Sequence, residues 1–352
     1  MSSPSLPYNP ALDGLRALSI LVVIAFHCLV PGFGGGHIGV DLFFVLSGYL
    51  ITALLAAEVR QGGIAVGRFY ARRLLRLYPP LLVLVVAYLA LAPLLFPQEP
   101  RWTMAILALT YVMDYAIAFN VLPPTLGVTW SLGIEEKFYL LWPVLLPMLL
   151  RARRPMHWLL GAFLVVTAWR YAVAVQWGWG QAYFRFDTRV TGIVLGVIAA
   201  LRPTAMPRWV VLAAWVAMVV NLALPSLPFQ WLTAGATVRV TVAEIAAFVL
   251  VSHAAAHPTG SWLAQPLMAW LGRLSYGLFL WHFAAISAFG RGHGPWVLLA
   301  VALPFALAMA IVCHYLIERP VSRWSRRRFM PDSPGGSSTA ATDIRVRHST
   351  GR

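Results

Sequence analysis

The sequence predicts an all-α protein, a polytopic bundle of transmembrane helices, and three observations support this fold class. The 352-residue chain is 60% hydrophobic and only 11% charged, whereas soluble domains carry about a quarter charged residues. Its mean hydropathy is +0.73. Apolar runs of membrane-spanning length follow one another along the chain, separated by short basic segments. A chain of this composition requires lipid as its solvent.

The apolar runs define the expected helices in order. About eleven are found, most of them long enough to cross a hydrocarbon core of about 30 Å. The first is expected to stay in the mature protein, because no positive charge precedes Arg16 and no small-residue cleavage site follows. The expected segments are 12–31, 38–57, 79–97, 102–119, 128–150, 157–176, 189–201, 207–224, 237–256, 266–289 and 295–317.

Arginine clusters set the expected orientation. They lie in the loop near 59–78, in the run 151–154 and at 323–328, and the positive-inside rule places all three in the cytoplasm. Three apolar segments between 78 and 151 would put two clusters on opposite sides, so one segment is expected not to span. The short segment 102–119, which contains Asp114, is the candidate. About ten crossings then remain, with both termini cytoplasmic.

The net charge of +15 could indicate a nucleic-acid partner, but the basic residues sit between apolar runs, as in membrane proteins. We therefore expect a lipid bilayer as partner and no nucleic acid. Residues 1–330 are expected to form one transmembrane domain. Residues 331–352 are rich in Ser, Gly and Thr without apolar periodicity, which predicts a disordered cytoplasmic tail.

Two ionisable residues share one face of the first segment. Arg16 and His27 are eleven residues apart, close to three helical turns, with a rise of about 16 Å between them. Such residues inside a membrane helix are functional candidates by default, and an imidazole can act as a general base toward a hydroxyl. The alternative is a histidine hydrogen-bonded between helices and an arginine that snorkels to the interface.

Further polar residues have two readings each. Arg73 and Arg76, with Arg72 beside them, suit phosphate binding, but the same arginines can anchor the chain to anionic lipid. Asp41 can serve the site or cap the second helix. A helix histidine such as His282, between Trp281 and Phe283, is more often a packing or hydrogen-bonding residue. No histidine pair has metal-ligand spacing, so no metal is expected.

A set of motifs resembles the membrane-bound acyltransferase 3 family in content and order, from about residue 9 to 328. Six such motifs in order are highly specific. Some relatives carry an additional SGNH-type esterase domain, and this chain is expected to lack it. The motifs are LDGLRALSILVVIAFH, GVDLFFVLSGYLIT, RFYARRLLRLYPP, TWSLGIEEKFYLLWP, WLGRLSYGLFLWH and IERP.

The resemblance implies an activity and a set of site residues. Family members generally take an acyl group, most often acetyl from acetyl-CoA, and place it on a hydroxyl of a surface glycan, lipid-linked sugar or secondary metabolite. The family's arginine and histidine motif falls on Arg16 and His27, and its paired arginines fall on Arg73 and Arg76. Its Trp-Ser-Leu motif with a following acidic residue falls on Trp130, Ser131, Leu132 and Glu136 or Glu135.

The residues suggest how this chemistry would proceed. Arg73 and Arg76, helped by Arg72, would hold the CoA phosphates while the pantetheine arm enters beside Arg16. His27 would deprotonate the acceptor hydroxyl, and Asp41 or Glu136 would orient its imidazole. A covalent acyl-histidine is the less favoured variant.

The acceptor side of the expected site comprises Trp130, Ser131 and Glu135. Glu135 and Glu136 follow Trp130 near the outer end of a segment and can face an acceptor. Their alternative is an interface ion pair with Lys137, the only lysine in the chain. The bias toward arginine is typical of a GC-rich genome, so we expect a bacterial inner membrane.

A different function class remains open on the residues alone. A bundle with buried arginines and a histidine can be a transporter or flippase for an anionic or sugar-lipid substrate, with His27 as a proton relay. Consumption of acetyl-CoA separates the two classes, because a transporter should leave acetyl-CoA unchanged.

Overall fold

A computed structural model describes residues 7–119, 125–224, 233–290 and 292–329 of the chain. Within these residues every regular element is helical and none is a strand, which confirms the all-α prediction. The expected tail at 331–352 lies outside the described residues.

The helices follow the apolar segments closely. Short 3-10 turns at Gly127–Thr129 and Trp262–Ala264 lead into two of them, and a π-helical stretch at His314–Glu318 joins the last two. The α-helices are α1 Pro10–His27, α2 Ile38–Arg60, α3 Val66–Leu95, α4 Arg101–Leu109, α5 Met113–Ala118, α6 Trp130–Arg151, α7 Pro155–Trp177, α8 Trp179–Phe184, α9 Phe186–Arg189, α10 Thr191–Leu201, α11 Arg208–Ala223, α12 Thr233–Ala256, α13 Pro266–Phe289, α14 Pro295–Cys313 and α15 Arg319–Phe329.

Local sequence explains where several helices begin. At the start of α1 the Asn9 side chain accepts hydrogen bonds from the backbone N–H groups of Ala11 and Leu12, at 3.0 and 3.3 Å. Helices α1, α7, α13 and α14 each have proline in the first turn, where its missing N–H costs no helical hydrogen bond.

Six helical stretches in the described part of the chain are long and apolar enough to cross a membrane: α1, α2, α3, α7, α12 from Gly235, and the continuous stretch from Pro295 to Ser325. The expected figure of about ten crossings therefore stays a prediction. The expected non-spanning segment 102–119 is divided into α4 and α5, of nine and six residues. Neither piece reaches the roughly 20 residues that a crossing needs.

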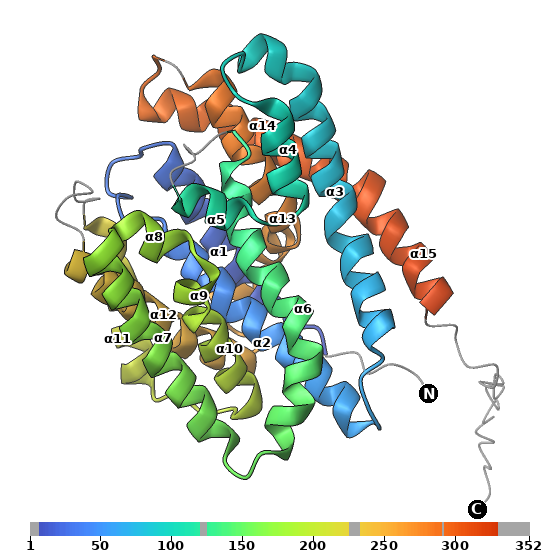
Figure 1. Ribbon diagram of the computed structural model, residues 1–352, viewed down its shortest axis with the longest axis vertical. Helices are drawn as coiled ribbons and strands as arrows, with labels where there is room; N and C mark the ends of the chain where they lie inside the picture. Colours follow the sequence, from blue (N-terminus) through green and yellow to red (C-terminus); the bar gives the residue numbers. More distant parts are fainter. Residues whose placement is uncertain (1–6, 120–124, 225–232, 291, 330–352) are drawn as a thin grey trace, which may run out of the picture.

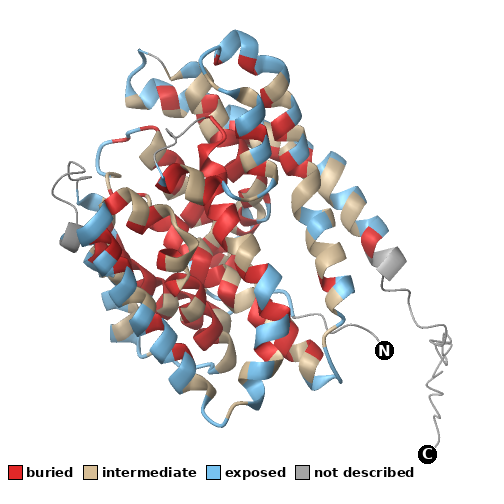
Figure 2. Cartoon of the chain, viewed as in Figure 1, coloured by how far each residue is buried: buried red, intermediate tan, exposed pale blue. Residues whose placement is uncertain are grey.

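The helices form one bundle with α1, α2 and α13 at its centre (Figure 1). The α2–α3 and α6–α7 connections lie at the same end of the bundle, toward which α15 also runs, and we call it the arginine end. Buried residues concentrate in the middle, whereas α3, α7 and α11 expose their outer faces (Figure 2). Those faces carry large apolar side chains such as Leu94, Val165 and Val219, as a lipid-contacting surface requires.

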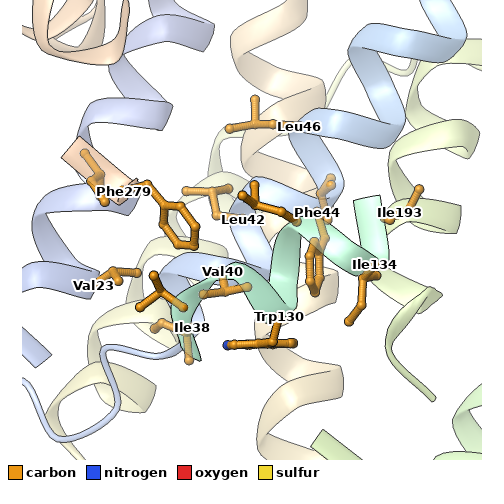
Figure 3. Packing of buried hydrophobic residues seen from close by; sticks show 14 of the residues in the cluster. Val23, Ile38, Val40, Leu42, Phe44, Leu46, Trp130, Ile134, Ile193 and Phe279 are labelled. Atoms are coloured by element: carbon orange, nitrogen blue, oxygen red, sulfur yellow. The ribbon is translucent and has the colours of Figure 1, made fainter. Parts of the chain in front are cut away.

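Apolar side chains from different helices interlock in the centre (Figure 3). Val23 of α1, Leu42 of α2 and Phe279 of α13 point into the same layer, and Trp130 and Ile134 of α6 close its other side. Each of these five side chains is less than a tenth exposed. This packing fixes the relative positions of the helices that carry the polar residues described below.

Glycines permit the closest helix contacts. A Cβ atom at Gly272 would overlap the carbonyl oxygen of Asp13, between α13 and α1. At Gly196 it would overlap the carbonyl oxygen of Val45 and meet Gly48, between α10 and α2. Small residues at these positions let backbones touch, as is typical of membrane helices.

We expect Gly196→Ala to lower the free energy of unfolding by about 1–3 kcal/mol, because α2 and α10 must separate to admit the methyl group. The measurement is thermal unfolding in detergent. Gly161→Ala on α7 is the matched control, since nothing lies within 4 Å of the added carbon. Equal unfolding temperatures for the two variants would contradict the close contact.

Candidate active site

A cavity of about 920 Å³ opens between α1, α2, α3, α6, α13 and α15. Among the described residues that line it are seven arginines and three carboxylates, so the cavity carries an excess of positive charge. We call it the arginine cavity. Its arginines are Arg16, Arg72, Arg73, Arg76, Arg273, Arg319 and Arg323, and its carboxylates are Asp13, Glu135 and Glu318.

The walls of the arginine cavity change character along its length. Apolar side chains of α2 and α6 line one part, including Val40, Phe43 and Leu132, and Phe279 of α13 joins them. A cavity with charged and apolar parts fits a ligand that has an anionic portion and a less polar portion.

The three arginines expected to bind phosphate all line this cavity, and each is held differently. Arg72 donates to Glu58 at 2.8 Å, so part of its charge is neutralised. The guanidinium of Arg73 lies 3.8 Å from the centre of the Tyr139 ring, and its buried Nε has no hydrogen-bond partner. Arg76 is exposed to the cavity and makes no ion pair within the described residues. Of the three arginines, Arg73 and Arg76 therefore have the guanidinium charges that remain available to bind a ligand.

Arg16 and the two acceptor-side residues also reach the cavity. Arg16 lines the cavity, and its Nη1 lies 3.4 Å from Asp13 Oδ1. Ser131 and Glu135 lie on its α6 wall. Glu135 accepts a hydrogen bond from Ser47 Oγ at 2.7 Å and one from Tyr139 at 3.3 Å. These bonds hold the Glu135 carboxylate between α2 and α6, so it is ordered but no longer fully free to contact a ligand.

Trp130 lies elsewhere. Its side chain is 8% exposed and packs among Phe44, Tyr183 and Phe184, with ring centroids 5.0–6.1 Å away. It is absent from the cavity lining. The expectation that Trp130 contacts substrate is therefore corrected: the aromatic cluster buries it behind the wall that Ser131 and Leu132 form.

His27 forms a pair with His282, the histidine that we expected to be a packing or hydrogen-bonding residue. His27 Nδ1 and His282 Nε2 are 3.1 Å apart. His282 is fully buried on α13, and its Nδ1 lies 2.7 Å from the carbonyl oxygen of Phe279 and 3.2 Å from that of Leu278. His27, at the end of α1, is only partly buried.

These distances fix the proton positions of the pair. A carbonyl oxygen only accepts, so His282 Nδ1 carries a hydrogen and, in the neutral ring, His282 Nε2 is an acceptor. His27 Nδ1 must then donate to it. His27 Nε2 is left with its lone pair, which is the state a general base needs.

The histidine pair lies just beyond the inner end of the arginine cavity. Phe279 lines the cavity and precedes His282 by three residues on α13, a rise of about 4.5 Å. The Phe279 and His282 rings have centroids 5.8 Å apart. A ligand that fills the cavity thus ends within one helical turn of the two imidazoles.

Neither carboxylate expected to orient His27 does so. Asp41 is fully buried and accepts from Arg189 Nη2 at 2.6 Å, and α2 has no side-chain cap. Glu136 is partly buried on α6 and does not line the cavity. Both assignments are corrected, because His282 occupies the position beside His27 Nδ1 that a carboxylate would take. The alternative pairing with Lys137 is also wrong, since Lys137 binds Asp114 at 2.8 and 2.9 Å.

Asp41 belongs to a buried ionic network that the sequence analysis did not predict. Arg170 of α7 binds Glu244 of α12 through two hydrogen bonds, of 2.9 and 3.1 Å, and Arg189 lies 3.7 Å from the same carboxylate. All four charged side chains are fully buried. We call Asp41, Arg170, Arg189 and Glu244 the buried ionic network. Charged residues within apolar runs were the sequence signal that could have revealed this network. The same signal, an ionisable residue in an apolar run, marks His282 as a functional candidate.

Across the described ranges, no three His, Cys, Asp or Glu side chains gather in a group that could hold a metal ion.

An imidazole with a free lone pair lies near an arginine-lined cavity inside a bundle of apolar helices, an arrangement that suits a membrane enzyme with an anionic ligand. Comparison with known proteins specifies the class. The sequence profile of the acyltransferase 3 family, described as an acyltransferase domain, matches residues 9–319. The chain belongs to this family.

Curated relatives agree with this assignment. The chain is 30% identical to the O-acetyltransferase OatA of Staphylococcus aureus strain NCTC 8325, over 93% of the chain and 60% of the relative. It is 31% identical to OatA of strain MRSA252, over 92% and 58%. A putative O-acetyltransferase of strain MSSA476 is 29% identical, over 89% and 57%.

The chain thus spans about 60% of the length of these relatives. No solved structure matches the chain.

Proposed function

We propose that the chain transfers an acetyl group from acetyl-CoA to a hydroxyl of a glycan, a lipid-linked sugar or a secondary metabolite. The observation that carries this proposal is the arginine cavity that ends one helical turn from the histidine pair. The printed names of the relatives, O-acetyltransferases, support acetyl as the transferred group.

Donor binding would use the charged and apolar parts of the cavity in turn. Arg73 and Arg76 would bind the pyrophosphate of CoA, because guanidinium groups form strong charge-assisted hydrogen bonds with phosphate. Arg72 is already paired with Glu58, so it would stabilise the bound phosphates through its electrostatic field rather than through a direct contact. The pantetheine arm would then pass Arg16 and the apolar wall, bringing the thioester past Phe279 to His27.

The transfer step follows from the tautomer of His27. Its Nε2 takes the proton of the acceptor hydroxyl as the hydroxyl oxygen attacks the thioester carbonyl carbon. The carbon–sulfur bond breaks, and CoA leaves as a thiolate that takes the proton back from His27. Throughout, His27 Nδ1 keeps donating to His282 Nε2, so the ring does not turn.

Orientation in the membrane follows from the positive-inside rule. We propose that the arginine end faces the cytoplasm, with both chain termini there, and that the acceptor approaches His27 from the opposite side of a bacterial inner membrane. Residues 1–330 would act as a single transmembrane domain. Membership of an enzyme family favours this function over a transporter that leaves acetyl-CoA intact.

His282 would act as a positioning residue. We expect His282→Leu to lower kcat by about 10²-fold, since His27 Nδ1 loses its acceptor and the ring can adopt the unproductive tautomer. The KM for acetyl-CoA should hardly change, because His282 does not line the cavity.

His282→Gln tests whether the hydrogen bond accepted from His27, rather than the imidazole ring itself, is what matters. Glutamine can accept a hydrogen bond through its side-chain oxygen, so this variant should retain more activity than His282→Leu. Equal losses in the two variants, with lowered unfolding temperatures, would mean that His282 only packs the core.

The proposed function is tested by measuring CoA release from acetyl-CoA with purified protein in nanodiscs and a panel of glycan and macrolide acceptors. Acceptor-dependent release of CoA, matched by acetylated acceptor in mass spectra, is the expected result. Failure of the protein to bind acetyl-CoA at all would overturn the proposal.

A further inference from the structure

Three arginines of the cavity have no part in the proposed function so far. Arg319 and Arg323 lie one turn apart on α15, and Arg273 lies on α13. All three are exposed to the cavity, and none has a carboxylate partner within the described residues. Arg273 donates to the Tyr8 hydroxyl at 2.9 Å. The Arg319 guanidinium lies 4.4 Å from the centre of the Tyr315 ring. We call the three the distal arginine group.

The nearby carboxylate does not neutralise this group. Glu318 lines the same part of the cavity, but it lies 2.9 Å from His314 Nδ1. Both residues belong to the π-helical stretch between α14 and α15. A π-helical turn re-aims the residues that follow it and is frequent at functional sites. Here it precedes Arg319 and Arg323 directly.

The depth of the two arginine sets can be compared along α13. The Tyr276 hydroxyl donates to the carbonyl oxygen of Leu77 at 2.7 Å, so Arg76 lies at the level of Tyr276. Tyr276 precedes His282 by six residues, about 9 Å, and Arg273 precedes it by nine, about 14 Å. Arg273 is therefore farther from the histidine pair than Arg76.

The α15 arginines lie farther still. Gly277 of α13 packs directly on Ala310 of α14, which places Ala310 at that level. From Ala310 the helix runs toward the arginine end (Figure 1). Arg319 and Arg323 follow nine and thirteen residues later, roughly 13 and 19 Å along the axis. Arg319 and Arg323 thus lie beyond Arg73 and Arg76 as seen from His27. Arg273 lies about level with Arg73, which is one turn nearer the arginine end than Arg76 on α3.

The chemistry of CoA has the same order. Its thioester is at one end, its pyrophosphate lies in the middle, and the 3′-phosphate of the ribose is at the far end. A phosphomonoester carries about −1.5 to −2 charges at neutral pH and suits a cluster of guanidinium groups. With the thioester at His27 and the pyrophosphate at Arg73 and Arg76, the 3′-phosphate falls at the distal arginine group.

We infer that Arg273, Arg319 and Arg323 bind the 3′-phosphate of CoA, so that the protein selects CoA thioesters over analogues that lack this phosphate. The inference rests on the proposed function, because it takes the thioester to be at His27. It adds a donor-specificity subsite distant from the reacting atoms.

The test is binding of CoA and of 3′-dephospho-CoA to the full chain in phosphatidylcholine nanodiscs, by titration calorimetry, which needs no acceptor. We expect CoA to bind about 10- to 100-fold more tightly. In the Arg319→Gln/Arg323→Gln double variant, CoA should bind only as well as dephospho-CoA does. The affinity for dephospho-CoA should stay within about twofold. Arg208→Gln, an exposed arginine outside the cavity, is the matched control and should keep the preference for CoA.

Each contrary result has a distinct meaning. Equal affinities of the wild type for both nucleotides would overturn the inference and leave acetyl-CoA as the donor. No binding of either nucleotide would remove the donor proposal as well. The double variant could instead keep the preference for CoA and no longer retain phosphatidylglycerol in native mass spectra. This result would mean that the distal arginine group binds a lipid headgroup, and it would overturn the inference.

Discussion

Replacing His27 by alanine is expected to lower acceptor-dependent CoA release by about 10³-fold, within the 10²–10⁴ range that general acid–base catalysis contributes. The variant removes the only nitrogen lone pair that the histidine pair leaves free, at the inner end of the cavity. Binding of acetyl-CoA should be unaffected, because His27 does not line the arginine cavity. The loss should therefore appear in kcat.

The controls for His27 separate chemistry from folding. His27→Ala should unfold at nearly the wild-type temperature, since the side chain is only partly buried. His157→Ala, on the exposed start of α7, removes an imidazole with no such partner and should retain full activity. A folded His27→Ala protein that still turns over acetyl-CoA would exclude His27 as the base.

Replacing Glu244 by methionine is expected to destabilise the fold by about 3–5 kcal/mol, because it leaves a buried guanidinium uncompensated. Glu244 of α12 accepts two hydrogen bonds from Arg170 and one of 2.6 Å from Thr191, so α7 and α10 lose a common partner. A loss of this size is a large share of the 5–15 kcal/mol that holds a typical domain together. Yield and thermal unfolding in detergent measure it.

A double-mutant cycle distinguishes lost charge pairing from lost packing. Arg170→Met alone should also destabilise, since it leaves Glu244 facing one arginine at 3.7 Å. Arg170→Met with Glu244→Met removes both charges and keeps similar volumes, so the double variant should be more stable than either single variant. Additive losses would show that the network contributes through shape alone.

Much of the fold followed from local sequence. The apolar runs became helices because lipid and the bundle interior both require internally satisfied backbone groups. The division of 102–119 was signalled by Asp114, which needed a partner that lipid cannot supply, and Lys137 of α6 is that partner. The number of membrane crossings was harder to predict from the sequence. Helices α10 and α11 are short, and the length of an apolar segment does not by itself show whether it crosses the bilayer.

The site was predicted in part. Arg16, Arg72, Arg73, Arg76, Ser131 and Glu135 all line one cavity, and their roles in it stay predictions. The partner of His27 was not accessible, because His282 is 255 residues away in the chain and only the packing of α1 against α13 brings the rings together. The same holds for Asp41, whose partner Arg189 is 148 residues away.

The sequence by itself indicated that this protein is embedded in a lipid bilayer. It also showed which residues are energetically costly to place there and which family the chain resembles. These properties depend on composition and on spacing within one helix. Tertiary structure alone decided which costly residue meets which, because a buried charge or imidazole is stabilised only by a partner within hydrogen-bonding distance. Helix packing therefore placed His282 beside His27 and Arg189 beside Asp41. It also placed Arg319 and Arg323 at a different depth of the cavity from Arg73 and Arg76.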